Sequence, residues 1–335
     1  ALSFPAVAAG RPALAGGPTA GVSVDLDILT QEFCAEMGWD PATGLISPYA
    51  FESTSQGTRA RFDLPQTGSR LLFFSASRRR SASPAKGQPT EVRPAGPVTV
   101  RPAGPNVLVI AYVDVRAGGA SQERTYFYQA AQFAFRKNGM ERNPWDSAVQ
   151  FKDELITRRV PPTSGVEATY RFTVKDRVPS GLTVVVERPD LYAILLNGKR
   201  VEAAKGEWWL DRAFGRIDVG SEARPGENEL VLRASPFTIH HEIEPAYVLG
   251  NFALAASESG FVIEADHPLS LGSWAQQGRP FYSQGVTYSR TYQVANQAGQ
   301  YRVELGRWYG SVARVAINGK VAGYAQSAPW TVDAT

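Results

Sequence analysis

Apolar and polar residues alternate along much of the chain, which predicts β-strands. Within 167–175, the apolar Tyr170, Phe172 and Val174 fall on one face, and polar residues lie between them. Residues 301–305 repeat the same alternation. A period of two with one apolar face is typical of a half-buried antiparallel strand, so we predict an all-β fold.

Two stretches of the chain share one plan. Residues 167–201 and 285–323 each open with a strand that contains a Thr-Tyr pair, turn at a glycine, and continue through two further strands to Asn-Gly-Lys. The Asn-Gly pairs, at 197–198 and 318–319, tolerate the positive φ angles of a two-residue hairpin turn. The shared order predicts a duplicated β-sandwich plan, with two unrelated hairpins as the alternative.

One segment departs from the strand pattern. Between residues 124 and 139, apolar side chains recur at helical spacing, which predicts one helix that packs on a sandwich and ends at Asn138-Gly139. The residues that set this spacing are Phe127, Ala130, Ala131, Ala134 and Phe135. Residues 106–115 are predicted to form a buried strand, and 148–156 another strand, entered through a turn at 143–146.

The order of the elements predicts three domains. Residues 1–78 would form a small β-domain, 79–256 a β-sandwich with one helix, and 257–335 a second sandwich. The Ser-, Arg- and Pro-rich stretch 75–89 is predicted to be an exposed linker. The last sandwich lacks a counterpart of the closing strand within 223–234, so we expect it to be incomplete and the sequence to be cut from a longer chain.

Composition narrows the picture further. The 335 residues suffice for two or three cores, and 31 Gly with 23 Pro suit a turn-rich all-β architecture. A net charge of +3 is too small to argue for nucleic acid or a membrane surface as a partner. Cys34 is the one cysteine, so no disulfide forms within the chain. No apolar run approaches the roughly 20 residues that span a bilayer.

Adjacent tryptophans form the first candidate for carbohydrate binding. Trp208 and Trp209 would point to opposite faces of a strand, one into the core and the other outward as a platform on which a pyranose stacks. Asp211 and Arg212 would bind the sugar hydroxyls. The alternative is that both rings are packed in the core. Trp274 offers a further aromatic surface.

A second candidate is the segment 237–245, which holds two of the three histidines. His240, Glu242 and Glu244 fall on one face if this segment is a strand. Such a face suits a sugar-hydroxyl site, a calcium site or a hydrogen-bonded structural cluster. Because the adjacent histidines would point to opposite faces, one metal ion would not easily use both, and we predict no cofactor.

Recognised catalytic motifs do not occur in the sequence. It contains no Gly-x-Ser-x-Gly, no Walker loop, no His-Glu-x-x-His and no dinucleotide-binding fingerprint. A pair of catalytic carboxylates is defined by its separation in space, so the sequence leaves that chemistry open. The pattern lacks the alternation of strand and helix that would build a barrel to present such a pair.

The C-terminal motifs resemble modules of large glycoside hydrolases. Residues 285–335 carry Leu305-Gly306, then Ala313 and Val315, then Asn-Gly-Lys at 318–320. This order resembles the galactose-binding-like jelly-roll modules of those enzymes, which implies tandem antiparallel β-sandwiches with one short helix.

The middle of the chain resembles a narrower family. The stretches NPWDSAVQFKDEL (143–155), GEWWLDRAFG (206–215) and SPFTIHHEIEPAYVLGNFAL (235–254) are similar to the C-terminal half of the α-L-rhamnosidases of glycoside hydrolase family 106. WDPATGLISPY (39–49), followed by GSRLLFF (68–74), resembles the β-domain that comes after their catalytic barrel.

This resemblance implies a role other than catalysis. In that family the catalytic carboxylates lie in the barrel, upstream of where this chain begins, so no catalytic residue is assigned here. The implied role is a non-catalytic C-terminal accessory part that supports the barrel and binds a glycan, in a periplasmic or secreted bacterial enzyme. Two alternatives stay open: a self-contained hydrolase or lyase with a carboxylate site in a sandwich cleft, and a plain adhesion or interaction module.

Overall fold

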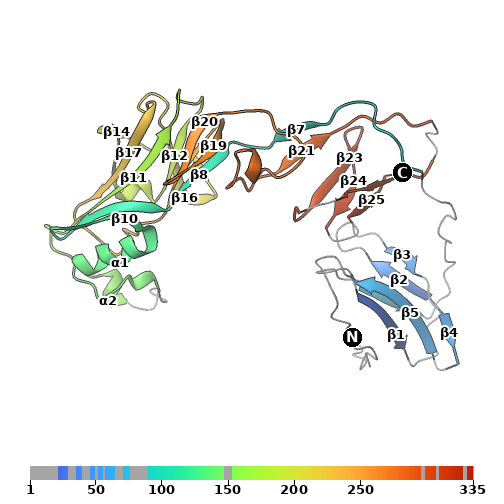
Figure 1. The fold of residues 1–335 in the computed structure, drawn as a ribbon. Helices are drawn as coiled ribbons and strands as arrows, with labels where there is room; N and C mark the ends of the chain where they lie inside the picture. The colour runs from blue at the N-terminus through green and yellow to red at the C-terminus, as the bar shows by residue number, and fades with distance from the viewer. Residues whose placement is uncertain are drawn as a thin grey trace. The chain divides into compact units, whose positions relative to one another are not determined.

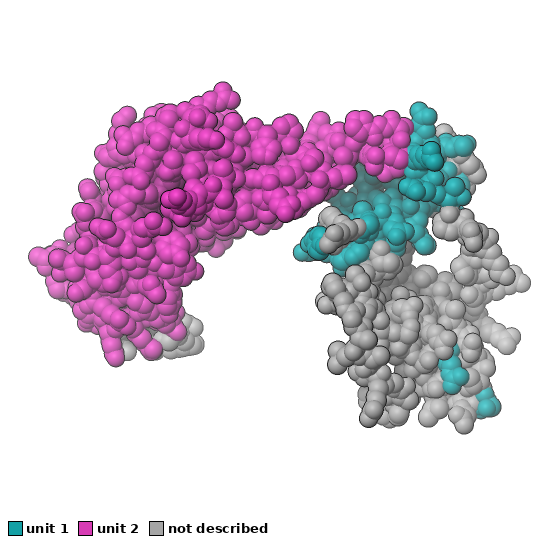
Figure 2. Space-filling model, viewed as in Figure 1, with its two compact units in different colours: residues 1–93, 293–335 teal, residues 94–292 magenta. Residues whose placement is uncertain are grey.

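A computed structural model describes the main part of the chain. The described residues are 22–28, 35–39, 46–49, 52–55, 57–64, 71–75, 90–146, 153–295, 299–306, 309–326 and 330–334. Contacts divide the chain into two compact units, residues 94–292 and residues 1–93 with 293–335 (Figure 2).

Most of the described chain is β-structure in antiparallel sheets, which confirms the all-β prediction (Figure 1). Within the described residues, helical structure is confined to α1 (Phe127–Lys137), the single turn α2 (Asp153–Ile156) and short 3-10 turns. No helix in this part of the chain is long and apolar enough to cross a bilayer.

The 94–292 unit contains two large sheets. The larger runs β10-β9-β11-β17-β13-β14, and β20 and β19 extend it beside β11. The β11–β20 pair is parallel, and the others are antiparallel. Its strands are β9 (Tyr112–Ala117), β10 (Ala120–Tyr126), β11 (Val166–Val174), β13 (Ala193–Leu196), β14 (Lys199–Val201), β17 (Gly226–Ala234), β19 (Phe252–Ser257) and β20 (Gly260–Ala265).

The smaller sheet runs β15-β16-β12-β18-β8. Its strands are β8 (Asn106–Ile110), β12 (Thr183–Glu187), β15 (Trp208–Trp209), β16 (Asp211–Asp218) and β18 (Ala246–Gly250). β8 pairs with β18, far along the chain. The buried Asn106 fixes this edge, because its side-chain amide donates 2.9 Å hydrogen bonds to the carbonyls of Phe252 and Gly278.

One core lies between the two sheets. Tyr170 and Leu230 of the larger sheet belong to the same buried cluster as Val184 and Ile217 of the smaller sheet. Burial of each such side chain stabilises the fold by about 1.5–3 kcal/mol. The alternation predicted for 167–175 is confirmed, since every second side chain of β11 is buried in this core.

The smaller sheet is also covered on its second face. Val107, Val185 and Leu249 form a separate buried cluster, against which Trp209 and Phe281 pack. Because both of its faces are covered, β12 is apolar without alternation, as is typical of a fully buried strand.

α1 forms where the helical spacing predicts it. Ala130, Ala131, Ala134 and Phe135 are its buried residues. Asn138 and Gly139 end the helix, as predicted, and Gly139 takes the left-handed conformation, with φ of 83°.

The strand predicted over 148–156 is wrong for its last residues. Residues 153–156 form the helical turn α2, whereas 147–152 lie outside the described residues. The predicted turn before it is the 3-10 turn η1 (Pro144–Asp146). Asp153 starts α2, and its carbonyl accepts hydrogen bonds from the backbone N–H and the hydroxyl of Thr157. These local bonds offer the backbone an alternative to a strand.

Both Asn-Gly hairpins are confirmed. Asn197 and Gly198 connect β13 to β14 with φ angles of 51° and 81°. Asn318 and Gly319 connect β23 (Ala313–Ile317) to β24 (Lys320–Ala325) with φ angles of 50° and 80°.

The second of the two similar stretches forms two-stranded sheets. β23 pairs with β24, β22 (Arg302–Glu304) with β25 (Thr331–Asp333), and β21 (Val286–Ser289) with β7 (Thr99–Pro102). The completeness of a second sandwich stays a prediction.

The N-terminal region contains two small antiparallel sheets. Their orders are β1-β5-β4 and β3-β2-β6. The strands are β1 (Val22–Ile28), β2 (Ala35–Trp39), β3 (Ile46–Tyr49), β4 (Glu52–Thr54), β5 (Gly57–Leu64) and β6 (Leu71–Ser75). Cys34 and residues 76–89 of the predicted linker lie outside the described residues. The domain boundaries at 78 and 256 stay predictions.

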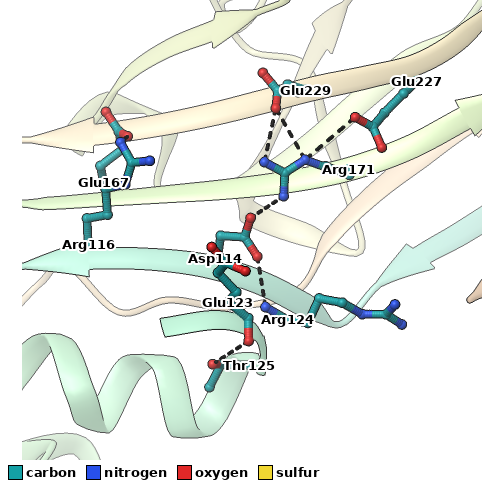
Figure 3. Close-up of polar contacts among 9 residues, drawn as sticks. All are labelled: Asp114, Arg116, Glu123, Arg124, Thr125, Glu167, Arg171, Glu227 and Glu229. Carbon is teal, nitrogen blue, oxygen red and sulfur yellow. Dashed lines mark hydrogen bonds and ion pairs between the residues drawn. The ribbon is translucent and has the colours of Figure 1, made fainter. Parts of the chain in front are cut away.

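An ion network crosses the solvent-facing side of the larger sheet (Figure 3). Arg171 of β11 contacts Asp114 of β9 and both Glu227 and Glu229 of β17. Asp114 also accepts a 2.8 Å hydrogen bond from the backbone N–H of Arg124. One guanidinium thus bridges three neighbouring strands on the polar face opposite the core.

Candidate functional site

A cavity of about 670 Å³ is lined by residues from both sheets of this unit. Its walls are the 3-10 turn η3 (Pro189–Leu191) with its flanks, the segment 200–208, and β16. This volume lies within the range of about 300–1,000 Å³ that is typical of ligand sites.

Unusual backbone conformations shape these walls. Arg188 has a positive φ of 45°, which turns the chain from β12 into η3. Gly215 lets η3 lie close to β16, because an added Cβ would stand 2.5 Å from Cγ of Pro189. Leu210, with φ of 67°, makes the tight turn between β15 and β16. A glycine at 215 is therefore a packing requirement of the cavity wall.

The two adjacent tryptophans have different surroundings. Trp209 is partly buried and packs against Tyr247, with ring centroids 5.0 Å apart. Trp208 is 50% exposed and lines the cavity. One packed ring and one exposed ring are what the sequence predicted, and the structure identifies Trp208 as the exposed one. Its role in sugar binding stays a prediction.

Of the two polar residues that follow the tryptophans, only one lies in the cavity. Arg212 is exposed and lines the cavity with Trp208. Asp211 does not line it, and its carboxylate accepts a 2.7 Å hydrogen bond from the backbone N–H of Ala213. Asp211 therefore stabilises the first residues of β16.

Sequence reasoning missed most of the charged residues of the cavity. Arg188 donates two hydrogen bonds, of 3.0 and 2.9 Å, to the carboxylate of Asp190. This hydrogen bonding lowers the pKa of Asp190 and raises that of Arg188. Arg200 pairs with Glu202 at 3.3 Å. Arg188 caps the turn η3 and Asp190 lies within it, and Arg200 and Glu202 lie in and just after the short strand β14, so no periodic pattern marks them.

Three carboxylates gather at a neighbouring crevice of about 10 Å³. Glu187 ends β12, and Glu242 and Glu244 reach the crevice from the segment that precedes β18. Burial raises the pKa of all three, and the nearby negative charges raise it further. The pKa of Glu244 rises to about 7.

The hydroxyls of the buried Tyr170 and the partly buried Tyr192 hold this segment in place. Tyr170 donates a 2.6 Å hydrogen bond to the backbone carbonyl of Glu244, and Tyr192 donates a 2.7 Å bond to that of Glu242. Asn143 donates a 3.0 Å bond to the carboxylate of Glu242. Tyr192 lines both the crevice and the larger cavity.

The interpretation of 237–245 as a strand is wrong. Residues 239–240 form a turn, and the backbone N–H of Thr238 bonds to Nδ1 of His241 across it at 2.9 Å. The buried His241 also lies 3.1 Å from the carbonyl of Leu191 through Nε2. These hydrogen bonds to the His241 side chain take the place of the backbone hydrogen bonds that pairing in a sheet would provide. Glu242 and Glu244 do come together, whereas the exposed His240 lies beside Trp145, with ring centroids 6.0 Å apart.

The carboxylate crevice is too small for a sugar ring. Its volume is close to that of one water molecule. Within the residues that the structure describes, no group of three His, Cys, Asp or Glu side chains is arranged to hold a metal ion. The three glutamates therefore form a compact polar cluster.

Trp274 lies outside both hollows. Its Nε1 donates a 2.5 Å hydrogen bond to the hydroxyl of Tyr288, and its ring contacts Tyr282 edge to face. Trp274 therefore packs against nearby residues of its own segment and lines neither hollow.

Comparison with known proteins gives one structural relative to report. No family model and no curated protein matches the chain. Among solved structures, it is similar to the rhamnosidase from Novosphingobium sp. PP1Y, with 16% identity and a TM-score of 0.21. The match covers 64% of this chain and 17% of that enzyme, so the chain spans less than a fifth of its length. Such a similarity carries no argument about activity.

Proposed function

We propose that this chain is a non-catalytic, carbohydrate-binding accessory part of an α-L-rhamnosidase-like glycoside hydrolase. In this proposal the cavity beside Trp208 is the sugar site, and the partner is a catalytic barrel of the same polypeptide. The observation that carries the sugar site is the half-exposed indole of Trp208 in the wall of a 670 Å³ cavity.

The chemistry of the cavity suits a sugar. A pyranose has an apolar C–H face, which an exposed indole covers at little entropic cost because Trp has only two side-chain torsions. Its hydroxyls need charged or polar partners at the edge of that platform. Arg212 supplies such a partner, because it lines the same cavity as Trp208 and lies on β16, the strand that pairs with β15.

Binding measurements with one matched control test this proposal. Trp208→Ala should weaken binding to a glycan by about 2 kcal/mol, or roughly thirtyfold in Kd, as expected for an aromatic anchor. Tyr128→Ala is the control, because Tyr128 is 48% exposed on α1 and does not line the cavity. A glycan library would supply the ligand, and calorimetric titration the affinity.

Two results would overturn the sugar site. One is the absence of binding to any glycan in the library. The other is binding that Trp208→Ala leaves intact. In the full-length enzyme, Trp208→Ala should lower the rate on a polymeric glycan and leave the rate on a small aryl glycoside unchanged. An equal loss on both substrates would place Trp208 in the catalytic step and refute the accessory role.

A further inference from the structure

The charges in the cavity beside Trp208 do not balance. Four cationic and three anionic side chains line it. Each of the three carboxylates already has a cation within ion-pair distance. The pairs are Asp190 with Arg188, Glu202 with Arg200, and Glu207 with Arg216.

Two of the lining cations remain after this pairing. Within the described part of the chain, Lys205 and Arg212 have no carboxylate within 4 Å. Both are exposed at the cavity wall, one in the loop before β15 and the other at the start of β16. The charge in the cavity that no ion pair neutralises is therefore positive, and it lies in the same cavity as the exposed ring of Trp208.

From this positive charge we infer that the cavity prefers an acidic sugar, one that carries a carboxylate or a sulfate group. The inference rests on the proposed function and names its class of ligand. Arg212 would bind the anionic group through its planar fork of N–H donors, Lys205 would add a point charge, and Trp208 would cover the C–H face of the ring.

The state of the carboxylates argues against a neutral sugar. Neutral sugars present hydroxyls, which bind best where side-chain acceptors are free to receive them. In this cavity both oxygens of Asp190 already accept hydrogen bonds from Arg188. Glu202 accepts one from Arg200 at 3.3 Å. Glu207 is ion-paired with Arg216 at 3.8 Å, so the charged lining residues that lack an ion-pair partner among the described residues are the cations Lys205 and Arg212, which favour an anion.

Paired glycans test the inference directly. The probes are α-1,4-linked trigalacturonate, its fully methyl-esterified and therefore neutral form, and glycan-library members with and without sulfate. Titration at low salt should give an affinity for an acidic member at least tenfold higher than for its neutral counterpart. This preference should shrink as salt is added, because exposed charges are screened.

Variants assign the preference to the two cations. Arg212→Gln combined with Lys205→Gln should remove the acidic preference, because the affinity for the acidic form should fall further than the affinity for the neutral form. Lys199→Gln is the control, because Lys199 is an exposed cation of β14 that does not line the cavity. Thermal unfolding of each variant checks that these exposed substitutions leave the fold intact.

The outcomes separate this inference from the proposed function. Equal affinity for acidic and neutral members overturns the acidic preference, while sugar binding itself stands. Loss of neutral binding in Trp208→Ala with an unchanged affinity for the acidic member would also overturn it, because the anion would then bind elsewhere. Binding to no member overturns both. A preference for sulfated members alone supports the inference and assigns the anionic group to sulfate.

Discussion

Replacing Glu244 with Gln should stabilise the protein above pH 7 and leave its stability unchanged near pH 4. Glu244 is half-buried at the crevice that it shares with Glu187 and Glu242. Burial and, to a smaller extent, the two neighbouring carboxylates together raise its pKa from 4.5 to about 7. Gln has nearly the same shape and carries no charge at any pH, so it removes the cost of ionisation.

The pKa fixes both the sign and the size of the effect. Below about pH 4.5 the carboxyl is protonated in the folded and the unfolded chain, so it costs nothing. Between about pH 4.5 and pH 7 the carboxyl ionises in the unfolded chain and stays protonated in the folded chain, so the free energy of unfolding falls over this range and levels off above pH 7. The full rise in pKa is worth at most about 3 kcal/mol. Water reaches the side chain and screens it, which leaves about 1 kcal/mol.

The assay is thermal or denaturant unfolding of the wild type, Glu244→Gln and a control at pH 4, 5.5, 7 and 8.5. Glu258→Gln is the control, because Glu258 is an exposed carboxylate in the turn between β19 and β20. At pH 8.5, Glu244→Gln should raise Tm by about 2–4 °C over the wild type. An equal shift at pH 4 and pH 8.5, or a lower Tm at pH 8.5, would refute the reasoning.

Two further predictions concern the turns and the ion network. Asn197→Ala should cost about 2–3 kcal/mol, because Asn197 has a positive φ and its side chain also bonds to Glu229, Glu222 and Asn228. Asn197→Gly keeps the backbone freedom and loses only the bonds, so denaturant unfolding should show a smaller cost, and equal costs would contradict a role for φ. Arg171→Met should lower the free energy of unfolding by less than about 1 kcal/mol in 0.15 M salt, because its ion pairs are exposed. A loss above 2 kcal/mol would show that the network is a main source of stability.

The fold could be predicted where one face of an element is buried. The alternation in β11 and the helical spacing in α1 each arise from a single buried face. The Asn-Gly pairs indicate turns that need positive φ angles. The failures at 153–156 and 237–245 arise where side chains bond to the local backbone. The hydrogen bonds of Thr157 and of His241 favour those conformations, and such bonds produce no periodic pattern of apolar residues in the sequence.

The site was predictable only in part. Adjacent tryptophans on a strand must point to opposite faces of the sheet, so one packed and one exposed ring could be expected. Which ring is packed could not be predicted, because Tyr247, which covers Trp209, comes from a strand about forty positions further along. Glu187 meets Glu242 and Glu244 through the packing of the sandwich, so no spacing connects them. Lys205 and the Arg188–Asp190 pair lie in irregular segments, and their place in one cavity depends on the close contact of Gly215 with Pro189.

The position of β8 in its sheet has a consequence for synthesis of the protein. Asn106 is hydrogen-bonded to Phe252, 146 positions later, so the edge of the smaller sheet stays open until that residue has left the ribosome. Until then the apolar segment NVLVI has no partner strand and is exposed on a nascent chain. Such segments are prone to aggregation, and pairing over so long a separation is slow. Production of this protein should therefore depend on chaperones, and chains that stop before residue 250 should be insoluble.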